Sequence, residues 1–230
     1  MGQGSETEKL SEQEQRLLDE RAGISSGRAF DRLINMSDAI VAVAMTVNVL
    51  SIVQIQRTSN SESVWTLITG HVGQIGSFCF TFIIVGTMWL AHNRILNRMR
   101  GYDATIFRLN LVWLLLIAIL PWPSTMYGIS LVFGRSGEVS DHAGVGLFYW
   151  GTLAAISALG ALIGRHARHR PALLDPNHPA DGRGQLRGWT FACFFLFIGV
   201  VSLFAPHVAA WLPLGLIALS LIFRRNRVVA

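Results

Sequence analysis

Polar side chains with complementary hydrogen-bonding chemistry stand at the ends of three apolar segments in this chain. Ser37 and Asp38 open the first segment, Trp89 and His92 close the second, and Asn110 lies early in the third. They supply a hydroxyl, a carboxylate, an indole N–H, an imidazole and an amide, so donors and acceptors are both present. Buried polar groups require partners, and we therefore expect these residues to bond to one another where the segments bring them to one level.

The same side chains give little support for catalysis. The sequence has no HExxH or GxSxG motif, no glycine-rich phosphate loop and no pair of carboxylates at catalytic spacing. We predict that the protein is not an enzyme and that it holds no cofactor or metal. Arg32, which precedes Ser37 and Asp38, adds a cation to the polar group.

The elements that position these residues are predicted to be membrane-spanning helices. Hydrophobic residues make up 51% of the chain and charged residues only 14%, against roughly 25% charged in a soluble domain. Charges are almost absent from stretches close to the ~20 residues that a helix needs to cross the bilayer core. The predicted fold is all-α and polytopic, with six spans at residues 33–55, 70–91, 105–122, 143–164, 188–205 and 208–223.

The distribution of positive charge predicts the orientation of these spans. Of the 19 lysines and arginines, seventeen lie in the leader, in the second-to-third and fourth-to-fifth connections and in the tail. The loops of the opposite side hold only Arg57 and Arg135. Because positive residues stay on the cytoplasmic side, we predict that both termini are cytosolic.

Two regions follow from this arrangement. Residues 1–27 mix both signs of charge with few apolar residues and are interpreted as a cytosolic polar leader. Residues 28–230 form the predicted six-helix transmembrane domain. The loop 165–187 is rich in arginine, histidine and proline. We interpret it as a solvated loop that follows the orientation rule, and we expect no nucleic-acid partner.

The first helix has an unusual composition for a helix that faces lipid. It is rich in alanine, and from Ala39 onward helical spacing places a mostly apolar stripe on one face. Two interpretations stay open: a central packing helix capped by Ser37 and Asp38, or a helix that lines a pore. The stripe comprises Val43, Thr46, Val47 and Leu50.

Short motifs in the first three segments, taken in order, resemble the transmembrane protein 175 family. They cover about the first 125 residues. They are Arg32-x-x-x-Met36-Ser37-Asp38, Ala42-Val43-Ala44-x-Thr46, Ser77-Phe78, Gly86-x-x-Trp89-x-x-His92, Leu109-Asn110-Leu111 and Leu120-Pro121-Trp122-Pro123-Ser124-Thr125.

This resemblance implies a potassium-permeable channel assembled as a homotetramer of six-helix subunits, with the first helix of each subunit lining the pore. By motif position, the apolar gate falls on Val43, Val47 and Leu50. The network that anchors the pore helix falls on Arg32, Ser37, Asp38, His92 and Asn110. We add Trp89 to this network because it is predicted to lie at the same depth in the membrane.

Four positions depart from the family pattern. Met36 replaces the usual phenylalanine, which keeps a bulky apolar side chain. Val43 and Val47 are smaller than the usual isoleucine or leucine, and Asn48 is polar where leucine is usual. These changes predict a wider or wetter constriction and affect potassium selectivity more than conduction.

The sequence therefore predicts a potassium-preferring cation channel in the cytoplasmic membrane of a prokaryote, with potassium ions, lipid and further copies of the chain as its partners. One alternative is a proton-coupled transporter or proton leak that uses Asp38 and His92. Another is a membrane scaffold without transport activity.

Overall fold

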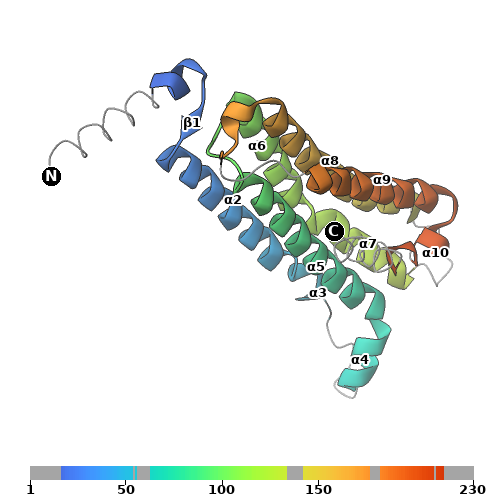
Figure 1. Cartoon of the computed structure of the whole chain (residues 1–230). Coiled ribbons are helices and arrows are strands. Elements are labelled where there is room, and N and C mark those ends of the chain that lie inside the picture. The colour runs from blue at the N-terminus through green and yellow to red at the C-terminus, as the bar shows by residue number, and fades with distance from the viewer. Residues whose placement is uncertain are drawn as a thin grey trace, which may run out of the picture.

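Long helices make up most of the regular structure in the computed structural model (Figure 1). It describes residues 17–53, 55, 63–133, 142–176, 182–209 and 211–214. The elements in chain order are β1 (Ser25–Ser26), α2 (Arg28–Val47), α3 (Leu50–Val53), α4 (Val64–Gly70), α5 (Val72–Leu96), β2 (Gly101–Tyr102), α6 (Ala104–Ile119), α7 (Pro121–Phe133), α8 (His142–His169), η1 (Pro171–Leu173), α9 (Gly182–Phe204), α10 (Pro206–Ala209) and η2 (Leu212–Leu214).

Five helical segments within the described residues are long and apolar enough to cross a membrane. They are Arg28–Val53, Val72–Leu96, Ala104–Ser130, Gly144–His169 and Gly184–Phe204. These segments coincide with the first five predicted spans, and the prediction of an all-α polytopic fold is confirmed. The sixth predicted span, 208–223, lies mostly outside the described residues, as does most of the leader 1–27, so the count of six stays a prediction.

The third span is longer than its sequence suggested. We predicted an end at residue 122, yet the helical path continues through α7, past Pro121 and Pro123. Pro121 is the first residue of α7, a position where its missing N–H costs no hydrogen bond. The Ser124 N–H donates to the Leu120 carbonyl oxygen at 3.1 Å, which joins α7 to the end of α6.

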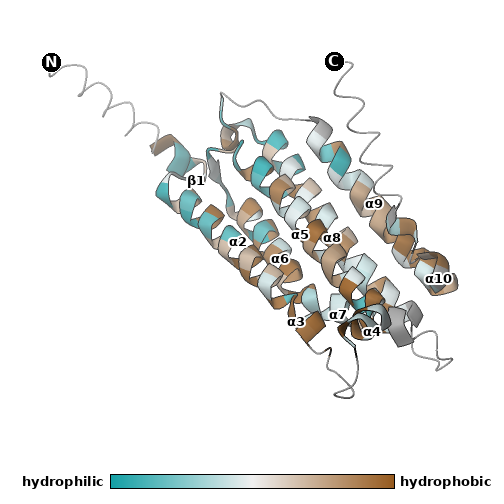
Figure 2. Cartoon of the chain, turned by 90° about the horizontal axis from the view of Figure 1, so that it is seen from below, coloured by the Kyte–Doolittle hydropathy of each residue, from teal (hydrophilic) through white to brown (hydrophobic). Residues whose placement is uncertain are grey.

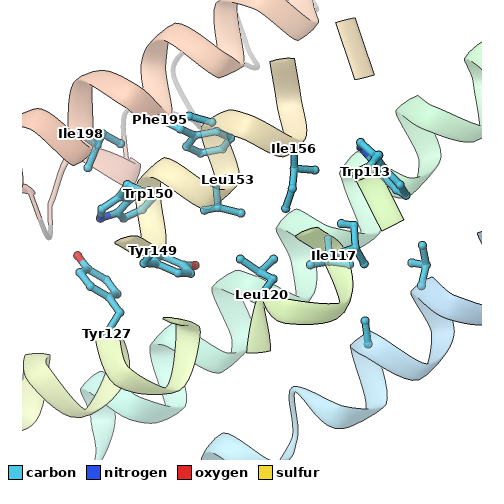
Figure 3. Close-up of a cluster of buried hydrophobic side chains, with 14 of the residues drawn as sticks. Trp113, Ile117, Leu120, Tyr127, Tyr149, Trp150, Leu153, Ile156, Phe195 and Ile198 are labelled. Carbon is cyan, nitrogen blue, oxygen red and sulfur yellow. The ribbon is translucent and has the colours of Figure 1, made fainter. Parts of the chain in front are cut away.

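The centre of the bundle is packed by aromatic side chains from α6, α7, α8 and α9. Trp150 of α8 lies between Tyr149, Tyr127 of α7 and Phe195 of α9, as Figure 3 shows. The helices α8 and α9 approach closely because a Cβ atom on Gly188 would lie only 3.0 Å from the Cβ of Ala161. α8 and α9 thus form a closely packed pair on one side of the bundle.

The first helix, α2, lies on the opposite flank from α9 (Figures 1 and 2). It packs against α5 and α6, while α6 packs in turn against α8. Hydrophilic residues gather at the end that carries β1, where α2 begins (Figure 2). We call this the inner end, and the end that carries α3 and α4 the outer end.

Candidate functional site

The two long sides of α2 differ in burial. Ser37, Val41 and Ala44 are buried against the other helices. Val43, Val47 and Leu50 remain 60%, 39% and 55% exposed in the single chain. This alternation follows the helical period, since positions three and four residues apart share a face. One side of α2 is therefore fixed inside the helix bundle, and the stripe predicted from the sequence faces outward.

Thr46 belongs to the outward side. Its hydroxyl donates to the Val43 carbonyl oxygen at 2.7 Å, and the residue is exposed. A hydroxyl that donates to its own helix keeps its oxygen lone pairs available to another group. Ala39, Ile40, Val43, Ala44 and Val47 also line a shallow apolar groove beside Ala118 of α6.

A chain of hydrogen bonds holds the buried side of α2. The Ser37 hydroxyl donates to the Leu33 carbonyl oxygen at 2.8 Å, and the Asn110 amide donates to the Ser37 oxygen at 3.0 Å. The Asn110 carbonyl oxygen lies 2.8 Å from His92 Nε2. Because Ser37 spends its only proton on Leu33, Asn110 must donate to it, and His92 Nε2 must then carry a proton and donate to Asn110.

The His92 ring is further fixed by an aromatic neighbour. It stacks on Trp113 of α6 with 3.9 Å between the ring centroids and 7° between the planes. Its Nδ1 is buried without a hydrogen-bond partner among the described residues. The imidazole of α5 is therefore held against α6 both by ring stacking on Trp113 and by its hydrogen bond to Asn110.

Asp38 makes a separate contact one residue further along α2. The Trp89 indole N–H donates to Asp38 Oδ1 at 2.7 Å. Trp89 and Asp38 are each partly buried, so this pair adds a second contact between α2 and α5 beside the chain of buried bonds.

The structure thus brings together five of the six residues predicted to anchor the first helix. Arg32 stands apart: its side chain is exposed, and within the described ranges it has no hydrogen-bond or ion-pair partner. Sequence reasoning missed Trp113, although its spacing of three residues from Asn110 places both on one helical face. It also missed the Leu33 carbonyl, the acceptor at the end of the chain of bonds.

Segments distant in sequence are tied together at the inner end, just before α2 begins. The strand β1 pairs with β2 in antiparallel register, Ser25 opposite Tyr102. Arg100 donates to Asp19 Oδ1 at 2.8 Å and to the Ala172 carbonyl oxygen at 2.6 Å. At Gly27, whose φ of 59° suits glycine, the chain turns from this small sheet into α2. The entry to α2 is therefore held by the α5–α6 and α8–α9 connections.

Asp103 makes a further connection between helices at the inner end. Its Oδ1 accepts from the backbone N–H groups of Thr105 and Ile106 and so caps α6. Its Oδ2 lies 2.8 Å from His166 Nε2 and 3.2 Å from an Arg170 nitrogen. Burial alone would raise the pKa of Asp103, but these hydrogen bonds and charges together lower it below its usual value. The carboxylate is ionised at neutral pH and joins α6 to the end of α8.

Carboxylates, histidines and cysteines do not gather into a metal site within the described part of the chain, where no group of three or more could hold an ion. The fold and the site define a multi-pass α-helical membrane protein whose first spanning helix is hydrogen-bonded along one side and bare along the other.

Residues 32–121 match the sequence model of a family described as the endosomal/lysosomal potassium channel TMEM175. The predicted resemblance to the transmembrane protein 175 family is therefore confirmed. The matched family is described as one of channels, which agrees with the prediction that the chain is not an enzyme.

Curated relatives match over part of their length. A protein of Streptomyces collinus named as a potassium channel is 25% identical over 109 residues, which are 47% of this chain and 52% of that relative. The endosomal/lysosomal proton channel TMEM175 of Rattus norvegicus is 26% identical over 200 residues, 77% of this chain and 38% of that relative. The match thus spans about half of the bacterial relative and less of the rat one.

Two solved structures share the fold. A lysosomal potassium-selective channel TMEM175 homolog from Chamaesiphon minutus superimposes with a TM-score of 0.65 at 19% identity, over 87% of this chain and 100% of that chain. A variant of the potassium channel MtTMEM175, in complex with a Nanobody-MBP fusion protein, gives 0.55 at 15% identity, over 90% and 96%. At these identities the likeness concerns the fold.

Proposed function

We propose that this chain is one subunit of a homotetrameric, potassium-permeable cation channel in which the α2 helices surround the pore. The observation that carries the proposal is the two-sidedness of α2. A pore-lining helix must be fixed on the side that packs against the other helices of its own subunit, and it must be free on the side that faces the ions. Ser37 is buried in the hydrogen-bonded network, while Val43 and Val47 project from the subunit. The names of the relatives and the matched family agree with this class of activity.

In this proposal, Val43, Val47 and Leu50 from each subunit form an apolar constriction. Apolar rings of this kind gate by excluding water until they widen. Thr46 places hydroxyl oxygens between two apolar rings, where they face an ion that has lost part of its hydration shell. Asp38, Trp89, His92, Ser37 and Asn110 act behind the helix and hold it at a defined rotation, so they set the width of the ring without touching the ion.

The proposed setting is the cytoplasmic membrane of a prokaryote, with both termini cytosolic. The positive charges support the orientation, because the arginines of the α5–α6 and α8–α9 connections lie at the inner end. Arg32 stands at the same end and is exposed. We propose that it pairs with an acidic group of a neighbouring subunit or with a lipid phosphate.

Proton conduction is a second candidate, because the relatives from rat and zebrafish are named proton channels. A proton route through Asp38 and His92 has little support from the contacts. His92 is buried against Trp113, and Asp38 is bonded to Trp89 on the side away from the apolar stripe. In this second candidate, protons pass through the same apolar ring as potassium.

One flux experiment separates these functions from a scaffold. Purified protein is reconstituted into liposomes that hold potassium chloride, diluted into a medium with a bulky impermeant cation, and followed with a pH-sensitive dye. Added protonophore lets protons enter in exchange for potassium and reports potassium flux. In a parallel sample, valinomycin carries the potassium, and acidification reports proton flux through the protein. Potassium flux above that of protein-free vesicles is expected in the first sample. If neither potassium flux in the first sample nor proton flux in the second exceeds that of protein-free vesicles, the protein is a scaffold without transport activity.

A further inference from the structure

The first spanning helix changes its winding at Asn48, just before Leu50. Through Asn48 the backbone bonds have α-helical spacing, with the Asn48 N–H donating to the Ala44 carbonyl oxygen at 3.0 Å. The next bonds are three residues apart, since Val49 donates to Thr46 and Ser51 to Asn48. These i to i−3 bonds define a tighter 3₁₀ turn between α2 and α3.

This turn sets the direction of Leu50. Side chains three residues apart eclipse one another in a 3₁₀ turn. In a regular α-helix, at 3.6 residues per turn, they are about 60° apart. The tight turn thus places Leu50 more nearly in line with Val47 than an unbroken helix would. Leu50 is exposed like Val47, whereas the adjacent Ser51 is buried.

Three buried polar residues hold this turn against α5. The Asn48 amide donates to the Phe78 carbonyl oxygen at 3.3 Å, and the Ser51 hydroxyl donates to the Asn48 carbonyl oxygen at 2.8 Å. The Gln74 amide donates to the Ser51 carbonyl oxygen. We call Asn48, Ser51 and Gln74 the outer clamp. Ser51 and Gln74 thus donate to carbonyl oxygens of the turn itself, and the Asn48 amide ties the turn to the backbone of α5.

The neighbouring helix α7 closes the outer clamp from the other side. A Cβ atom on Gly128 would lie 3.3 Å from the Cα of Gln74 and 3.2 Å from the Cβ of Ser77. α7 therefore packs directly on the stretch of α5 that carries Gln74. The Asn48 side-chain oxygen is buried without a hydrogen-bond partner among the described residues, so the turn is held there although one polar group is left unsatisfied.

From these contacts we infer that Asn48 and Gln74 are positioning residues that hold Leu50 in line with Val47 and so set the outer part of the constriction. The inference rests on the proposed channel function. It gives α2 a second anchor, independent of the Ser37 network at the inner end. Loss of the outer clamp allows the turn to relax towards α-helical winding, which rotates Leu50 away from the line of Val47.

The first test measures the clamp itself, without ion flux. Gln74→Met keeps the length of the side chain and removes its donor, while Val72→Met changes an exposed residue of the same helix as the matched control. Backbone amides of residues 49–53 are followed by hydrogen–deuterium exchange in the purified protein. We expect roughly three- to twentyfold faster exchange in Gln74→Met, as the loss of one hydrogen bond within a membrane protein gives, and no change in Val72→Met. Unchanged exchange in both would overturn the clamp.

The second test measures whether the clamp acts through Leu50. The ratio of potassium to sodium flux is compared in liposomes for wild type, Gln74→Met, Leu50→Ala and the double variant. We expect each single variant to lower the ratio and the double variant to equal Leu50→Ala. Equal ratios in wild type and Gln74→Met, or fully additive effects in the double variant, would overturn the role of the clamp in the constriction.

Two further variants guard against a loss of folding. Asn48→Leu removes the bond to Phe78 and serves as the equivalent of Gln74→Met if the latter does not assemble. Gln74→Glu restores a donor only when its carboxyl group is protonated. Its flux ratio is expected to approach the wild-type value as the pH falls, while the wild-type ratio is measured over the same range as the control. If wild type itself carries no potassium flux, the channel proposal fails, and the exchange experiment still decides the clamp.

Discussion

Asn110 offers the most direct test of the network behind the first helix. It is fully buried, and it joins α5 to α2 by accepting from His92 and donating to Ser37. Asn110→Leu removes both hydrogen bonds while keeping a side chain of similar volume. His92 Nε2 then carries a buried N–H without an acceptor. Ser37 keeps its own bond to the Leu33 carbonyl and is less affected.

The expected loss follows from these two contacts. Side-chain hydrogen bonds in membrane proteins average about 0.6 kcal/mol, so two of them give about 1.2 kcal/mol. Stranding the His92 donor costs roughly 1–3 kcal/mol in addition. We therefore expect Asn110→Leu to lower the free energy of unfolding by about 2–4 kcal/mol, which is a large share of a typical stability of about 5–15 kcal/mol.

The assay is unfolding of the purified protein by sodium dodecyl sulfate, followed by tryptophan fluorescence. Leu115→Ala is the matched control, because Leu115 lies on the same helix and is 56% exposed. His92→Phe combined with Asn110→Leu replaces both partners by apolar groups and keeps a ring on Trp113. The double variant should regain much of the loss, since no buried donor is left unpaired. Wild-type stability in Asn110→Leu, or additive losses in the double variant, would refute the reasoning.

Three further outcomes are expected. Val43→Ser should raise basal cation flux in liposomes by wetting the constriction and Val43→Phe should lower it, whereas a fall in both would identify α2 as a packing helix. Asp103→Asn keeps the cap of α6 but removes the charge beside His166 and Arg170. Because the pKa of Asp103 is lowered in the folded protein, its charge stabilises above about pH 4 and this contribution disappears as the pH falls through the lowered pKa. Melting temperatures of the two proteins should therefore differ at pH 7 and converge in acid, and a constant difference would contradict the ion pair. A cysteine at Thr66 should react with an impermeant thiol reagent outside intact cells and one at Ala172 should not, while the reverse pattern would overturn the orientation.

The hydrophobic segments were predictable because their signal is local. A helix that crosses a bilayer needs a long run of apolar residues, and five such runs were found where the structure has spanning helices. The two sides of α2 were predictable for a related reason, since Val43 and Val47 follow the helical period. The exception is Pro121, where a residue that ends most helices instead begins α7. Its neighbours Leu120 and Ser124 continue the backbone bonding, which a reading of proline alone does not reveal.

The candidate site was predictable only in part. The sequence indicated which polar residues lie at one level, because the order of the spans fixes which helix ends meet. It did not indicate which of these side chains form hydrogen bonds with each other. In the structure, Asp38 pairs with Trp89, while Arg32 is exposed. Partner choice depends on the rotation of each helix about its axis, and that rotation is set by packing against neighbours distant in the sequence.

Composition and periodicity by themselves thus determined a polytopic helical protein and the apolar stripe of its first helix, and short motifs indicated the family that the chain resembles. Tertiary structure alone decided three features: the change of winding at Asn48, the bond from Gln74 to Ser51, and the joining of Asp103 to His166. The physical reason is the range of the interactions. Hydropathy and helical spacing act over one or two turns, whereas these hydrogen bonds form only after helices separated by 23 to 63 residues have packed together.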